Sequence, residues 1–215
     1  MVRHISILGL VAAGCALVLS DADRIATPAQ PGCCASVDFR YEPKVNGEYH
    51  LMFNNHSGRQ IVAYTFERGS RQDGTLLFGA PIPEGYYEET LRLTPQSGAL
   101  RLVSVVFDDG SFEGDAKASG WNLVALKAAQ DESAKRVPML REYIQGRISQ
   151  DNARAEIGDV PNATITHNLT REEMAANMGR ADVRGFHRDF IESGHKSAGE
   201  VDQLEARYNL LKGRR

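Results

Sequence analysis

The stretch that decides the fold is LRLVSVVFDDGSFEGD, residues 100–115, because the pattern of apolar residues changes there from strand to helix. Residues 100–107 are nearly all apolar, as expected of a central strand that is buried on both faces. Asp109-Gly110 supplies the positive φ that a tight hairpin turn requires. Asp115 is suited to cap a helix. We therefore expect strands before residue 115 and helices after it.

Upstream of this stretch, apolar residues alternate with polar ones, which is the pattern of half-buried strands. The alternating apolar positions are Val37, Phe39 and Tyr41, then Tyr49, Leu51 and Phe53, then Val62, Tyr64 and Phe66, and finally Leu91 and Leu93. Turn signals such as Asn46-Gly47 and Asp73-Gly74 separate the runs. About six short strands and a stub at 111–113 predict an α+β protein with an immunoglobulin-like antiparallel β-sandwich over residues 36–114. The Cys…Trp…Cys core of antibody domains is missing, so the likeness is architectural.

Downstream, residues 115–215 predict a helical C-terminal region with a loop at 149–169. The first helical stretch contains Pro138, which either kinks one long helix or starts a second one. Gly158 and Pro161 favour the loop, because both residues interrupt helical patterns.

Further helical segments follow that loop. Thr170 and Glu173 form a capping box before a helix that we expect to end at Gly179, and another short apolar stripe stops at Gly194. The last helix, over residues 199–212, needs a cover for its narrow apolar stripe, since so short a helix is marginal in water by itself. The stripe consists of Val201, Leu204, Tyr208 and Leu211.

The N-terminus has the order of a secretory signal, with a basic head, an apolar run up to Leu19 and small residues after it. We therefore expect a signal peptide at 1–22 and a flexible segment at 23–35. An uncleaved N-terminal membrane anchor and lipidation at Cys15 are the alternatives, and membrane contact is expected through these two routes alone. The sequence thus predicts an exported protein, periplasmic or secreted.

Cys33 and Cys34 are adjacent, and no distant cysteine of the folded body is there to pair with them. Adjacent Cα atoms lie about 3.8 Å apart, below the ~4.4–6.8 Å of ordinary disulfides. We therefore expect intermolecular pairing, or two thiols near the N-terminus, rather than a bridge between the two. A vicinal redox switch and a soft-metal site are the alternatives, but no further metal ligand lies nearby in the sequence.

Composition excludes several classes of function. The chain has 215 residues, of which 25 are basic and 28 acidic, so it lacks the basic footprint of a nucleic-acid-binding protein. Three cysteines are too few for a disulfide scaffold or a Cys-rich zinc module. Neither a phosphate-cradling glycine loop nor a G-x-S-x-G nucleophile motif is present in the sequence.

From the sequence alone we assign no catalytic, cofactor-binding or metal-binding residue, and we expect no cofactor. The acidic cluster at 108–115 does not have the spacing of a calcium loop, and turn and cap roles account for it. Trp121, the single tryptophan, is expected to anchor the first helix to the sandwich. The histidines that could share a pocket with an acid are His50, His56, His167, His187 and His195.

Two motifs carry a resemblance to a known group. They are Asn54-Asn55-x-Ser57-x-x-Gln60-Ile61-x-Ala63-Tyr64 and Val105-Val106-Phe107-x-Asp109-Gly110-Ser111-x-x-Gly114-Asp115. Over about residues 36–150 the chain resembles a group of uncharacterised exported bacterial proteins. The resemblance implies a pair of sandwich strands, an F-x-D-G hairpin and a long polar helix. It implies no activity, and it does not extend to the C-terminal 60 or so residues.

Together these patterns favour a non-enzymatic binding or assembly module at the cell envelope, with an envelope protein as its partner. One alternative is an envelope hydrolase whose site is assembled from scattered His, Asp and Ser residues. The other is an adaptor that binds a partner through its C-terminal helices. A concave pocket that holds two of the histidines and an acid would favour the hydrolase.

Overall fold

The computed structural model describes residues 33–44, 48–92, 99–159, 169–194 and 197–212. The expected signal peptide, Cys15 and all but the last three residues of the segment 23–35 lie outside these ranges. His167 and His195 also lie outside them.

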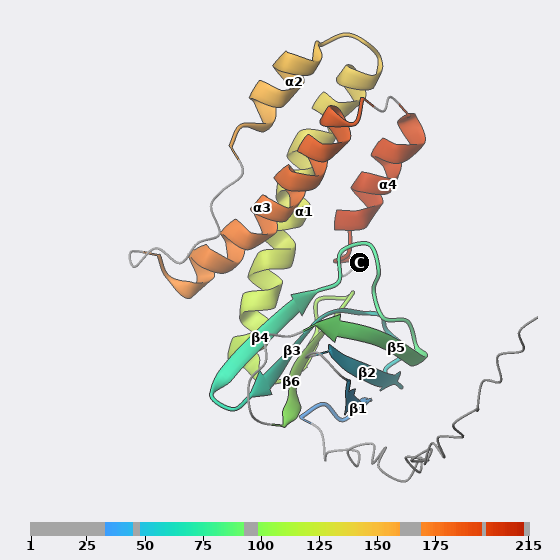
Figure 1. Cartoon of the computed structure of the whole chain (residues 1–215), viewed down its shortest axis with the longest axis vertical. Coiled ribbons are helices and arrows are strands. Elements are labelled where there is room, and N and C mark those ends of the chain that lie inside the picture. Colours follow the sequence, from blue (N-terminus) through green and yellow to red (C-terminus); the bar gives the residue numbers. More distant parts are fainter. Residues whose placement is uncertain (1–32, 45–47, 93–98, 160–168, 195–196, 213–215) are drawn as a thin grey trace, which may run out of the picture.

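Seven strands in the described residues form two antiparallel sheets (Figure 1). The three-stranded sheet has the order β1-β2-β5, and the four-stranded sheet has the order β4-β3-β6-β7. The strands are β1 (Val37–Pro43), β2 (Glu48–Asn55), β3 (Ile61–Arg68), β4 (Arg71–Leu76), β5 (Gly85–Arg92), β6 (Leu100–Phe107) and β7 (Phe112–Gly114). The stub expected at 111–113 is β7, shifted by one residue.

An aromatic core joins the two sheets. The ring of Phe53 on β2 lies 5.1 Å from that of Phe39 on β1 and 5.0 Å from that of Tyr64 on β3, centroid to centroid. Leu51 and Phe107, from opposite sheets, are fully buried in the same cluster. The α+β class with two packed antiparallel sheets is therefore confirmed.

The four helices are α1 (Ala116–Ile144), α2 (Gln150–Ile157), α3 (Arg171–Glu192) and α4 (Ala198–Tyr208). Figure 1 shows α1 rising from the sandwich, with the other helices gathered around its far part. Leu126 of α1 packs on Val62 and Val106, which lie on the outer face of the four-stranded sheet. Since Val105 faces the sandwich core, β6 is buried on both faces, as its sequence predicts.

The structure decides between the two alternatives for Pro138, and it contradicts the helix end expected at Gly179. Pro138 lies inside α1, which continues as one helix to Ile144. Gly179, where we expected a helix to end, lies in the middle of α3. A Cβ atom at Gly179 would stand 2.1 Å from the carbonyl oxygen of Ala125 on α1. This glycine therefore serves a close helix crossing and not a stop.

The prediction of a loop at 149–169 is wrong for the described part of that range, because α2 lies there. Ser149 caps that helix by accepting a hydrogen bond from the N–H of Asn152 at 3.2 Å, and Gly158 ends it with φ of +69°. Three arginines donate to carbonyl groups at its end. They are Arg136 to Glu156, Arg188 to Gly158 at 2.5 Å and Arg184 to Asp159 at 2.9 Å.

The apolar stripe of the last helix is covered within the chain. Val201 is fully buried in a cluster with residues of α1, α2 and α3, and Tyr208 is buried against Ala129 and Val183. The helix ends at Tyr208, so Leu211 lies beyond it. An adaptor function through this stripe would need the helix to leave its present contacts.

We expect Gly179→Ala and Gly185→Ala, two identical changes in α3, to have opposite effects on stability. Alanine favours helices over glycine by about 1 kcal/mol, and nothing lies within 4 Å of a Cβ at Gly185, so that variant should gain up to about 1 kcal/mol. At Gly179 the clash with α1 should instead cost about 2 kcal/mol. Urea unfolding of both variants measures the difference, and equal effects would contradict the close crossing.

Candidate functional site

A groove of about 420 Å³ lies where β4, α1 and α3 meet, and we call it the β4 groove. Trp121 comes from α1, Met174 and Met178 come from α3, and Gln72 and Gly74 come from β4. Met178 is half exposed. The groove thus presents apolar surface to solvent.

The strand that borders this groove has an unpaired edge. In the described residues β4 pairs with β3 alone. Arg68 and Arg71 are partners across the two-residue turn, and the N–H of Leu77 donates to the carbonyl of Val62 at 3.0 Å. Because hydrogen-bonded pairs alternate along an antiparallel ladder, the backbone groups of Gln72, Gly74 and Leu76 point to the free edge.

Gly74 faces the side chain of Asn122 on α1. We expected a turn at Asp73-Gly74, but both residues lie inside β4, and the turn is at Gly69, with φ of +62°. A Cβ atom at Gly74 would stand 2.9 Å from Oδ1 of Asn122, whose Nδ2 donates to Oγ1 of Thr65 at 3.0 Å. The glycine therefore makes room for the Asn122 side chain rather than for a bend.

The flank of the groove formed by α1 and α3 is positively charged. The guanidinium of Arg171 lies 4.6 Å from the ring centroid of Trp121, and the ammonium of Lys117 lies 5.6 Å from it. Neither cation forms an ion pair with a described carboxylate. Arg71 on β4, in contrast, is paired with Asp73 at 2.7 Å. The groove therefore combines apolar surface with Arg171 in its lining, and Lys117 lies near its Trp121 end; neither cation is paired with a carboxylate of the described residues.

A larger cavity, of about 730 Å³, lies between α3, α4 and the connection from β4 to β5. The guanidinium of Arg207 stacks at 3.9 Å on the ring of Phe186. Asp189 and Glu200 line the same cavity. Its lining therefore mixes both signs of charge and favours no single class of ligand.

The acidic cluster at 108–115 is occupied by contacts within the chain. Asp108 accepts a hydrogen bond from Nζ of Lys212 at 2.6 Å, and Asp115 caps α1 by accepting from the N–H of Ala118 at 2.8 Å. Glu113 accepts from the N–H and Oγ of Ser36 at 3.0 and 2.5 Å. Burial opposes ionisation of Glu113, but the bonds from Ser36 and the charge of Arg59 offset it and lower the pKa of that carboxyl.

The described histidines do not converge. His50 lies between Glu42 and Glu88, at 3.9 and 3.3 Å, on the outer face of the three-stranded sheet. His56 lies 3.1 Å from Asp38 and is exposed. His187 is fully buried in the helical layer. Among the described residues no concave pocket brings two histidines and an acid together, so the arrangement that would favour a hydrolase is not found there.

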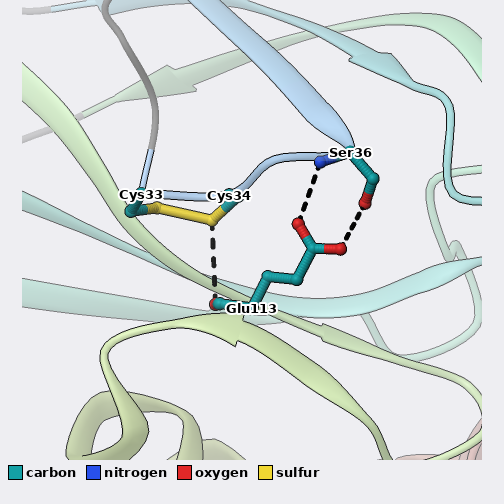
Figure 2. The surroundings of a disulfide bond; sticks show 4 residues. All are labelled: Cys33, Cys34, Ser36 and Glu113. Atoms are coloured by element: carbon teal, nitrogen blue, oxygen red, sulfur yellow. Dashed lines mark hydrogen bonds between the residues drawn. A yellow bond between two sulfur atoms is a disulfide. The ribbon is translucent and has the colours of Figure 1, made fainter.

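Cys33 and Cys34 are joined in a disulfide, contrary to our expectation (Figure 2). Cys34 is 3% exposed and belongs to the sandwich core, and its Sγ lies 3.7 Å from the carbonyl oxygen of Glu113. Ser36 is held by the same Glu113, as Figure 2 shows. This segment is thus docked on β7, which the sequence did not indicate.

Cys33 and Cys34 should differ in reactivity once reduced. In full-length protein carrying Cys15→Ser, treatment with dithiothreitol and then iodoacetamide should alkylate Cys33 about tenfold faster than the buried Cys34. Mass spectrometry of peptides sampled over time measures both rates. Alkylation of the untreated protein at either position would contradict the bridge.

His187 should make stability fall in mild acid. Burial, and then the charge of Arg136, lower its pKa from 6.5 to about 4. The unfolded chain therefore takes up a proton between these values that the folded chain excludes. The free energy of unfolding should drop by about 3 kcal/mol from about pH 7 to about pH 4 through this group, and His187→Phe should remove that part of the slope. Identical pH profiles for wild type and variant would contradict the prediction.

Comparison with known proteins gives no relative. No protein-family model matches the chain, and no curated protein or solved structure is similar to it. In the described residues no helix is both long and apolar enough to cross a membrane.

Proposed function

We propose that this protein is a binding module of the cell envelope that takes an extended peptide segment of a partner protein along β4. The observation that carries the proposal is the unpaired edge of β4 beside an apolar groove. An added strand would pair its backbone with Gln72, Gly74 and Leu76. Alternate side chains of the peptide would then enter the groove, because side chains along a strand alternate between its two faces.

The groove also defines the chemistry of the peptide. Trp121, Met174 and Met178 favour apolar side chains, and methionine adapts to different shapes. Arg171 and Lys117 favour a carboxylate close to the Trp121 end of the groove. The preferred ligand is therefore an extended segment with alternating apolar residues and an Asp or Glu.

We also propose that the sandwich is immunoglobulin-like, on the basis of its strand order. In constant-type immunoglobulin domains the first, second, fifth and fourth strands form one sheet, and the third, sixth and seventh form the other. The order β1-β2-β5 and β4-β3-β6-β7 differs from this in the fourth strand alone. Export, and membership of the group of exported bacterial proteins that the sequence resembles, remain proposals that rest on the N-terminal pattern and on the two motifs.

Selection from a phage-displayed library of random peptides tests the function. The full-length protein should select peptides with alternating apolar residues and an acid. Met178→Asp should weaken the selected peptide about tenfold or more, because it removes apolar contact and adds a repelling charge. Fluorescence anisotropy with a labelled peptide measures the affinities.

Phe112→Asp is the matched control. Phe112 is 41% exposed, against 50% for Met178. It lies on β7, which forms the edge of the four-stranded sheet opposite to β4. This variant should bind the peptide as wild type does. Selection of no peptide above background, or equal loss in both variants, would refute the proposal.

A further inference from the structure

Three arginines gather at one end of the sandwich, around a cavity of about 180 Å³. Arg68 is the last residue of β3, Arg71 is the first of β4 and Arg92 is the last of β5. The cavity therefore lies where the two sheets meet. Among the described residues, Asp73 is the one carboxylate in its lining.

Arg68 is the unusual member of this group. It is 2% exposed, and its Nε and Nη1 have no hydrogen-bond partner. The ring of Tyr49 lies 5.9 Å from its guanidinium carbon, which gives the cation a weak aromatic contact. Buried polar groups are normally hydrogen-bonded, and a buried charge is normally paired, since removal from water is otherwise uncompensated.

The nearby carboxylates serve other arginines. Asp73 pairs with Arg71 at 2.7 Å, and Glu48 lies 3.8 Å from Arg92. No described carboxylate forms an ion pair with Arg68. The cavity thus keeps a surplus positive charge next to two donor nitrogen atoms that lack an acceptor.

We propose that this cavity binds a small oxyanion, with Arg68 as its principal ligand and Arg71 and Arg92 at its rim. An oxyanion supplies both missing features, the negative charge and the acceptor oxygens. The shared chemistry is that of phosphate, sulfate or a carboxylate group. The site differs from the peptide groove in its principal ligand, because Arg68 lies on the side of its strand that faces the sandwich core, as Phe66 does two residues earlier. Arg71, Asp73 and Gly74 line both.

Isothermal titration calorimetry with inorganic phosphate tests the site on the full-length protein, with sodium acetate as a second arm. Phosphate binding without acetate binding identifies a tetrahedral anion, whereas acetate binding identifies a carboxylate site. Arg68→Met should abolish binding. Arg71→Gln leaves Asp73 unpaired at the cavity and should weaken binding about tenfold.

Arg101→Met is the control, because Arg101 is exposed on β6 and pairs with Glu67 away from the cavity. It should bind the anion as wild type does. If Arg68→Met does not fold, Arg92→Gln, which changes an exposed side chain, should still weaken binding severalfold. Absence of heat in both arms for wild type, or binding unchanged in Arg68→Met or in Arg92→Gln, would overturn the proposal.

Discussion

The structure depends on one constraint, which is that the four-stranded sheet carries apolar residues on both faces and must be covered on both. Val105 faces the sandwich core, whereas Val62 and Val106 face away from it. A sandwich alone would leave the second face in water. The packing of Leu126 of α1 on this face removes its apolar surface from water. The same packing brings the remaining helices to the sheet.

The segment between β6 and α1 also binds both ends of the described chain, near Ser36 and near Lys212. The backbone N–H of Lys212 donates to the carbonyl of Asp108 at 2.6 Å, and its ammonium bonds the carboxylate of the same residue. Glu113 holds Ser36, which fixes the disulfide segment beside β7. The acidic residues Asp108 and Glu113 therefore hold the C-terminal and N-terminal segments of the described chain against the sandwich.

The β4 groove follows from the same packing. Gly179 lets α3 approach the backbone of α1, and Gly74 leaves room beside β4 for the side chain of Asn122 on α1. The groove lies in the angle that remains between them, with Trp121 and Met178 on its surface. The proposed peptide site and the proposed oxyanion site adjoin along β4, where Arg71, Asp73 and Gly74 line both, but Trp121 and Met178 belong to the first and Arg68 to the second.

The sequence by itself determined the secondary-structure classes, the change from strand to helix near residue 115, the capping residues Asp115 and Thr170 and the double burial of β6. These features depend on neighbours a few residues apart, which a sequence displays directly. It did not reveal that Gly179 lies within a helix, that Gly74 lies within a strand or that Arg68 is buried without a partner. Each of those depends on an atom more than forty residues away, or on a partner that is missing after folding, so only the tertiary structure decided them.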